Sequence, residues 1–307
     1  MKRTTPIPVT LVTGFLGSGK TTFLLRLAQS HPREKILFLV NEFARDNIDG
    51  TTLATSGRPT HSVVGGSLFC ECKAADFVRL MRQEVTALYH RDEITHVVIE
   101  TSGIADPSAI GRLMDQHGLS ADFEIRRIVN IISPLRFPRL LANLPSVRAQ
   151  VQACDTVIIN QTDLASAAQI ERLYRLVSAA NPGATLLSAD HCDLPFDLNG
   201  RTADRTLPTA PLSTCDANPF TTATVTFERP VRITALRAWL EALPPAVLRV
   251  KGRVRTSAGW REVQHTVGNS AITLSDHEDK SCLVVITHDR NEPTLHRVVR
   301  KLQSLNV

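Results

Sequence analysis

The residues that could do chemistry begin with an octapeptide near the N-terminus, GFLGSGKT at positions 14–21. It fits the pattern G-x-x-x-x-G-K-[ST], whose glycines leave backbone N–H groups free to surround phosphate oxygens. In this pattern Lys20 reaches the β- and γ-phosphates and the Thr21 hydroxyl binds Mg²⁺. The pattern therefore predicts a nucleoside triphosphate bound by Gly14, Gly17, Ser18, Gly19, Lys20, Thr21 and Thr22.

The flanking residues supply the elements that must position this loop. Residues 9–13 are β-branched or apolar and predict a buried strand, and residues 22–28 carry apolar side chains at helical spacing. Strand, glycine-rich loop and helix are the context in which the pattern binds phosphate. This context disfavours an ordinary glycine turn, which is the alternative interpretation.

An acidic residue, Glu100, follows a later predicted buried strand, in the sequence IETSG of residues 99–103. In a P-loop NTPase, an acid here helps to hold Mg²⁺ through water, and a glycine N–H meets the γ-phosphate. We predict these roles for Glu100, which replaces the more usual Asp, and for Gly103. The alternative is a glutamate that only caps a strand. The predicted catalytic residues are Lys20, Thr21, Glu100 and Gly103.

The pair Asn160 and Asp163 has the N-x-x-D spacing of guanine recognition. A carboxylate at Asp163 can accept hydrogen bonds from N1–H and from the exocyclic amino group of guanine, and adenine presents no such pair. Gln161 stands where a lysine is usual, so some affinity is lost while selectivity remains. After the next predicted strand, Ser188 and Ala189 could offer a backbone N–H to the guanine oxygen. These residues predict GTP as the nucleotide.

The thiols of Cys70 and Cys72 form the most ambiguous feature. Two thiols at this spacing can bind Zn²⁺ or another thiophilic ion, but a closed site needs further ligands, which Glu42, Glu71 or a histidine could supply. The neighbouring Lys73 favours thiolates yet repels a cation. The alternative is two cysteines in a loop without a metal.

Residues 41–49 leave the second predicted strand with several acids and amides. They are placed to form a switch segment that senses the γ-phosphate. A polar surface loop is the alternative. His191 and His277 each lie between acidic residues, and we interpret both as surface-loop residues rather than metal ligands.

Composition restricts the class of protein further. The chain has 307 residues, 43% of them hydrophobic, and no apolar run approaches the ~20 residues of a membrane span. Its six cysteines are too scattered for a disulfide framework. We therefore expect a cytoplasmic protein that does not bind membranes.

The net charge of +5 comes from the last third of the chain, where Arg249, Lys251, Arg253 and Arg255 alternate along one predicted strand. A solvated sheet face is the favoured interpretation, and a surface for an anionic partner is the alternative. With only two Trp and two Tyr, the stacking on which single-stranded nucleic acid depends is poorly supported.

The order of elements predicts the architecture. Residues 1–195 alternate apolar strands with helices, which predicts an α/β P-loop domain with a mainly parallel sheet. Residues 196–218 read as a linker. Residues 219–307 predict a smaller α+β domain with an antiparallel sheet.

Taken together, these motifs resemble the CobW-type GTPases over nearly the whole chain. The segments that carry the resemblance are 14–22 (GFLGSGKTT), 40–43 (VNEF), 48–49 (ID), 100–107 (ETSGIADP), 243–245 (LPP) and 250–252 (VKG). The resemblance implies a GTPase domain with a C-terminal α+β domain. It also implies slow GTP hydrolysis coupled to delivery of Zn²⁺ or Co²⁺ to a client metalloprotein or enzyme, and it allows a nucleotide-dependent homodimer.

The sequence departs from the family at its metal motif, C-x-C-C after a glycine. Aligned on residues 65–66, the motif falls on residues 67–70 and keeps one thiol, and aligned on residues 70–72 its third thiol becomes Lys73. Ala44 also replaces a glycine usual in that loop. The prediction is a GTPase metallochaperone, with a metal-independent GTP switch acting through the C-terminal domain as the alternative. A nucleic-acid-binding ATPase is the least favoured.

Overall fold

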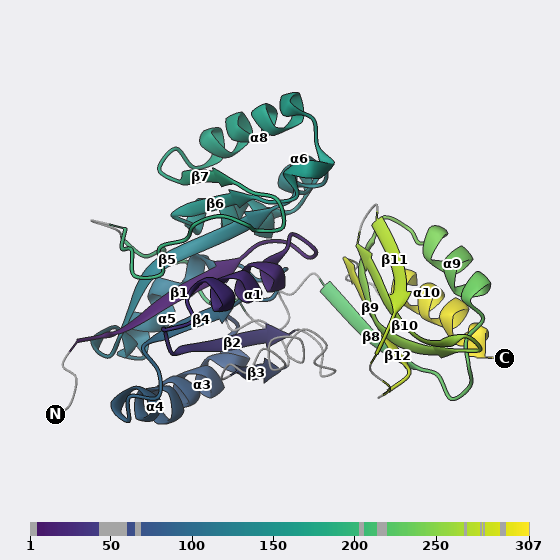
Figure 1. Ribbon diagram of the computed structural model, residues 1–307, viewed down its shortest axis with the longest axis horizontal. Coiled ribbons are helices and arrows are strands. Elements are labelled where there is room, and N and C mark those ends of the chain that lie inside the picture. Colours follow the sequence, from purple (N-terminus) through teal and green to yellow (C-terminus); the bar gives the residue numbers. More distant parts are fainter. Residues whose placement is uncertain are drawn as a thin grey trace. The chain divides into compact units, whose positions relative to one another are not determined.

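The computed structural model describes residues 5–42, 60–64, 69–202, 206–213, 220–266, 269–276, 278, 280–288 and 293–306. The chain divides into two compact units, Met1–Cys215 and Asp216–Val307. Each unit is built around its own sheet (Figure 1). Among the described residues, no helix is both long and apolar enough to cross a membrane.

The first unit contains a seven-stranded sheet in the order β3-β2-β4-β1-β5-β6-β7, and every neighbouring pair is parallel. Every residue of β1, β4 and β6 is buried, as expected of strands covered on both faces. The predicted α/β class is confirmed. The strands are β1 Ile7–Thr13, β2 Ile36–Glu42, β3 Thr60–Val64, β4 His96–Glu100, β5 Phe123–Ile132, β6 Thr156–Ile159 and β7 Thr185–Ser188.

Helices cover both faces of this sheet (Figure 1). They are α1 Lys20–Ser30, α3 Glu71–Arg79, α4 Thr86–His90, α5 Ile110–Gln116, α6 Phe137–Asn143, α7 Pro145–Ala153 and α8 Ala167–Ala180. A π-helical segment, Leu80–Val85, joins α3 to α4. Residues 71–90 therefore form one continuous helix that is locally wider at its centre.

Packing of α1 on the sheet places the start of that helix. Phe23 and Leu24 of α1 lie in one buried cluster with Val12 of β1 and Val98 of β4. Phe196 joins the same cluster and meets the Phe23 ring edge to face at 5.1 Å. Because these contacts fix the helix, its first turn stands at the carboxyl ends of β1 and β4.

The described part of the predicted linker lies along the first unit. Gly111 donates its N–H to the carbonyl of Pro208 at 2.8 Å, and Ala210 donates to that of Ser108 at 2.9 Å. Ser213 donates to the carbonyl of Phe69 at 2.9 Å. Hydrogen bonds therefore extend the first unit through residue 213.

The second unit has a five-stranded antiparallel sheet in the order β11-β10-β9-β12-β8. Its buried cluster joins side chains of β9 and β12 to those of α9 and α10. The predicted C-terminal α+β arrangement is confirmed. Its elements are β8 Phe220–Thr226, α9 Ile233–Glu241, β9 Val247–Thr256, β10 Gly259–Thr266, β11 Asn269–Leu274, β12 Cys282–His288 and α10 Pro293–Gln303.

The four basic residues of β9 were predicted to form a sheet face exposed to solvent, and they do not all do so. Val250 and Val254 lie in the core, so the cations share the other face as predicted. Arg253, however, is only 5% exposed, and Arg249 and Lys251 are half-buried. Only Arg255 of the four is exposed. The solvated interpretation is therefore wrong for Arg253.

Candidate nucleotide-binding site

The glycine-rich loop runs from the end of β1 to the start of α1. Three of its glycines have positive φ angles: 134° at Gly14, 74° at Gly17 and 107° at Gly19. A Cβ atom at Gly14 would collide with the carbonyl oxygen of Ile131, and one at Gly19 would collide with the side-chain amide of Asn160. The pattern demands glycine here because the backbone needs both the left-handed conformation and the space.

Lys20 joins the loop to the acidic strand end. Its side chain is buried, and Nζ donates to the carbonyl of Gly14 at 2.9 Å. The same Nζ lies 4.0 Å from Oε1 of Glu100, which β4 brings beside Val12 of β1. The structure thus brings together the cation and the carboxylate that the two motifs predicted separately.

The loop also fits a phosphate ligand. Ser18 is buried, and its Oγ has no hydrogen-bond partner within the described parts of the chain. A buried hydroxyl without a partner is costly, and a phosphate oxygen would accept a hydrogen bond from it. Thr21 and Thr22 are half-buried in the first turn of α1. The hydroxyl of Thr21 and the carboxylate of Glu100 are oxygen donors of the kind that Mg²⁺ prefers.

The segment after β4 lies against the loop. Thr101 donates its N–H to the carbonyl of Val12 at 2.9 Å. A Cβ at Gly103 would stand 2.7 Å from the backbone nitrogen of Leu16, so the two backbones approach closely. The structure therefore places Gly103 beside the phosphate loop, where the sequence predicted that its N–H acts.

Asn160 forms hydrogen bonds with both the phosphate loop and the loop after β7. It follows β6 and is 2% exposed. Its Nδ2 donates to the carbonyl of Ser18 at 2.9 Å, and its Oδ1 accepts the N–H of Cys192 at 2.8 Å. Burial raises the pKa of the Cys192 thiol to about 12, so the thiol stays protonated beside the loop. The motif residue thus links the phosphate loop to the loop after β7.

Two side chains that sequence reasoning did not place here reach the carbonyl of Gly17. Nη2 of Arg136 lies 3.3 Å from that oxygen, and Nε2 of Gln161 lies 3.4 Å from it. Burial lowers the pKa of the Arg136 guanidinium. Gln161, which replaces the usual lysine, thus still contacts the loop. Arg136 lies between β5 and α6 with no motif around it, so no spacing could have indicated it.

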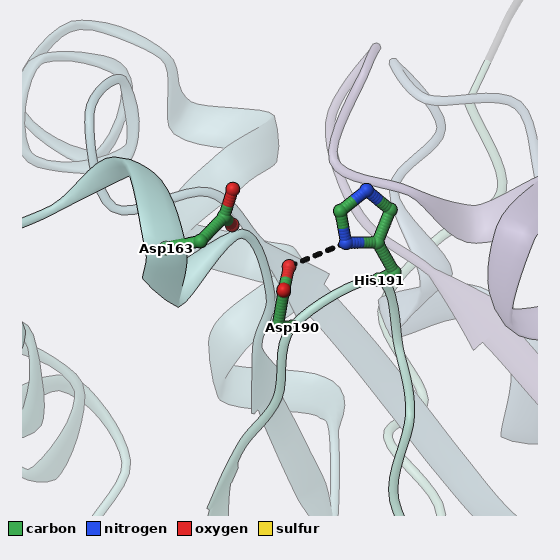
Figure 2. Close-up of side chains that lie close together, drawn as sticks. All are labelled: Asp163, Asp190 and His191. Carbon is green, nitrogen blue, oxygen red and sulfur yellow. Dashed lines mark hydrogen bonds and ion pairs between the residues drawn. The ribbon is translucent and has the colours of Figure 1, made fainter.

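Asp163 lies in the short helical turn Thr162–Leu164 and meets the loop after β7. Figure 2 shows its carboxylate beside Asp190 and His191, with the imidazole bonded to Asp190. Ligand atoms of the three side chains lie within 4.8 Å of one another, and all three residues are exposed. The sequence interpretation left His191 in an ordinary surface loop and did not foresee this cluster.

The predicted base contact at Ala189 is not available in this conformation. Ala189 donates its N–H to the carbonyl of Ile159 at 2.9 Å, which continues the pairing of β7 with β6. Ser188 is the last residue of β7 and is exposed. The role predicted for Ser188 stays a prediction.

The cysteine loop is described only in part. Cys70 precedes the first residue of α3, is 6% exposed and pairs with Ser213 in an isolated bridge. Cys72 lies in the first turn of α3, and Glu42 ends β2. The side chains of these last two residues, together with residues 43–50 and 65–68, lie outside the described part of the chain. The metal ligands predicted at Cys70, Cys72 and Glu42 therefore stay a prediction, as does the switch segment.

Two family descriptions match the chain. Residues 8–188 match "CobW/HypB/UreG, nucleotide-binding domain", and residues 220–303 match "Cobalamin synthesis protein cobW C-terminal domain". The first alone spans more than half of the chain, and the two together cover both units.

Similar proteins carry names of one kind. The zinc chaperone YeiR of Escherichia coli is 30% identical over 183 residues, which are 59% of this chain and 54% of YeiR. Zinc-regulated GTPase metalloprotein activator 1 of Saccharomyces cerevisiae is 26% identical over 62% of this chain and 49% of its own length. The matches thus span about half the length of these relatives.

The Zn(II)-bound YjiA GTPase of E. coli aligns over 98% of this chain and 99% of its own, with 21% identity and a TM-score of 0.49.

Proposed function

We propose that this chain, which belongs to the CobW/HypB/UreG family, binds GTP with Mg²⁺ and hydrolyses it slowly to GDP and phosphate. The nucleotide state is coupled to delivery of a divalent metal, Zn²⁺ or Co²⁺, to a client protein. The observation that carries the proposal is Asn160, which bonds the phosphate loop at Ser18 while standing three residues before Asp163. Phosphate binding and base recognition thereby belong to one site.

The hydrolytic step rests on positioning and charge. Lys20, fixed between Gly14 and Glu100, contributes a cation to the phosphates, and Gly103 contributes a backbone N–H at the γ-phosphate. Thr21 and, through water, Glu100 would hold Mg²⁺, which would neutralise charge on the phosphate oxygens. Because these contributions are positioning and charge, turnover is expected to be slow unless a partner contributes.

Cys70 and Cys72 are the proposed ligands of the cargo metal, with Glu42 as a further ligand. They lie at the start of α3, and Glu42 ends β2, the strand beside β4. Relatives named zinc chaperones favour Zn²⁺ as the cargo. The client is a metalloprotein or a metal-dependent enzyme.

Base selection is tested by Asp163→Asn. The variant keeps one acceptor oxygen but turns an amide N–H toward the guanine amino group, so one charge-assisted hydrogen bond, worth about 1.5–3 kcal/mol, is lost and GTP affinity falls at least about tenfold. Xanthosine triphosphate, whose ring carries a carbonyl in place of the amino group, should bind the variant better than it binds the wild type. The matched control is Glu171→Gln, an exposed carboxylate on α8. Equal affinity of the wild type for GTP and ATP would refute guanine recognition.

Cargo binding is tested by titrating Zn²⁺ and Co²⁺ with and without a non-hydrolysable GTP analogue. We expect tight binding only with the analogue, and loss of that binding in Cys70→Ala/Cys72→Ala. Cys154→Ser serves as the control because its thiol is buried at the end of α7, where it bonds the carbonyl of Val151. Metal binding that ignores the nucleotide would contradict the proposed coupling.

One observation favours a second candidate, the metal-independent switch. Cys70 is buried, and Lys73 stands where a third thiol would complete the motif. In that case a client would be retained by the GTP-bound protein equally well with both cysteines replaced. Loss of client binding in the double variant would rule this candidate out.

A further inference from the structure

Two buried side-chain amides form hydrogen bonds with the backbone of the segment that follows Glu100. One comes from Gln150, which lies on α7 and is 1% exposed. Its Nε2 donates to the carbonyl of Gly103 at 3.2 Å and to the carbonyl of Ala105 at 2.9 Å. Both N–H bonds of one amide are therefore used on one short stretch of backbone, and this pattern sets the orientation of the amide.

The second amide is that of Asn41, near the end of β2. Its Oδ1 accepts the N–H of Ser102 at 3.4 Å. Asn41 is 4% exposed and is the first residue of the predicted switch segment, residues 41–49. The backbone just before Gly103 is thus held by β2, and the backbone just after it by α7.

The peptide unit that carries the N–H of Gly103 lies between the hydrogen bonds made by Asn41 and Gln150. Its neighbour on one side is held through the Ser102 N–H, and its neighbour on the other side through the Gly103 carbonyl. The close approach of Gly103 to Leu16 limits any movement toward the phosphate loop. Because both flanking peptide units are held, the Gly103 N–H can change direction only through a concerted rotation about ψ of Ser102 and φ of Gly103.

We propose that Gln150 is a positioning residue for the γ-phosphate: it presets the Gly103 N–H by holding the carbonyls on the far side of that peptide. The inference rests on the proposed GTPase function and assigns to α7 a role in it. GDP has no γ-phosphate, so its binding does not depend on the hydrogen bonds made by Gln150. Gln150 therefore controls discrimination between the triphosphate and the diphosphate, together with the hydrolysis rate.

The test compares Gln150→Leu with Gln152→Leu. The two glutamines are two residues apart on α7, and only Gln152 is exposed. Affinities for GDP and for a non-hydrolysable GTP analogue are measured with Mg²⁺, and GTP hydrolysis is followed in a single turnover. In Gln150→Leu we expect unchanged GDP affinity, with the analogue affinity and the single-turnover rate each about tenfold lower. Gln152→Leu should match the wild type.

A role in stability alone would lower the unfolding temperature while leaving the ratio of analogue to GDP affinity unchanged, and that result overturns the inference. A wild type that neither prefers nor hydrolyses GTP would instead refute the proposed function. The two failures are thus distinguishable.

A second measurement does not depend on the variant folding. In NMR spectra of the wild type, the side-chain amide protons of Gln150 should exchange with water far more slowly than those of Gln152, and the analogue should shift them more than GDP does. Equally fast exchange of the two amides, or equal shifts with the two nucleotides, overturns the inference.

Discussion

Replacing Asn160 with alanine tests whether one amide holds the site together. The side chain bonds the carbonyl of Ser18 at 2.9 Å and the N–H of Cys192 at 2.8 Å. Its partner residues are buried, at 3% and 1% exposure, so water does not readily replace the lost bonds. Each buried polar group left without a partner costs about 1–3 kcal/mol, so we expect a loss of about 4 kcal/mol in the stability of the first unit.

The aromatic residues allow the two units to be followed separately. Both tryptophans, Trp239 and Trp260, lie in the second unit, and both tyrosines, Tyr89 and Tyr174, lie in the first. In thermal unfolding, far-UV circular dichroism reports both units, whereas tryptophan fluorescence reports the second. For a unit of this size the expected loss lowers the melting temperature by about 10 °C in the transition without a tryptophan signal.

Asn143→Ala is the matched control. Asn143 also donates its amide to a backbone carbonyl, that of Arg139 at 2.7 Å, but it is exposed on α6. Water replaces that bond, so the cost should stay within about 0.5 kcal/mol. If Asn160→Ala costs no more than Asn143→Ala, or if it moves the tryptophan transition alone, the structural role assigned to Asn160 is refuted. We also expect weaker GDP binding in Asn160→Ala than in the control.

Two further predictions concern the cores. Burial lowers the pKa of His96 from 6.5 to about 3. The unfolded chain takes up a proton at this histidine as pH falls below 6.5 and the native state does not, so stability should drop by about 1.6 kcal/mol between pH 6.5 and pH 5. Urea titrations should show this slope reduced in His96→Gln but not in His90→Gln, and an unchanged slope in the first would contradict the assignment. In the second unit, a Cβ at Gly252 would collide with the backbone carbonyl of Cys282, so Gly252→Ala should cost about 2 kcal/mol or more in the tryptophan transition. Gly183→Ala, whose Cβ meets nothing closer than 3.6 Å, should be neutral, and equal effects of the two glycine variants would show that β9 and β12 can move apart.

Local patterns in the sequence predicted the framework of the first unit. The order of glycines, Lys20 and Thr21 is a local requirement of one turn between a strand and a helix, and the φ angles of 134° at Gly14 and 107° at Gly19 show why glycine is needed. Unbroken apolar runs likewise predicted strands covered on both faces, because a strand open to water on one side would alternate. Such features depend on neighbours along the chain, so sequence reasoning reaches them.

The π-helical segment Leu80–Val85 and the hydrogen bonds of residues 208–213 to the first unit were not predicted. In each case, packing between segments decided what local composition left open. The proline- and threonine-rich stretch resembles a linker in composition, yet its backbone carbonyls and N–H groups find partners on α5 and beside Cys70.

By itself the sequence determined that a phosphate loop, an acidic strand end and a guanine-type motif are present, since each is a short pattern with its own chemistry. Only the tertiary structure decided how they meet: that Asn160 bonds Ser18, that Arg136 reaches Gly17, and that Gln150 holds Gly103. These pairs lie 142, 119 and 47 residues apart along the chain. Their contacts follow from strand order and from the seating of α1 and α7 on the sheet, and no spacing between neighbouring residues encodes that.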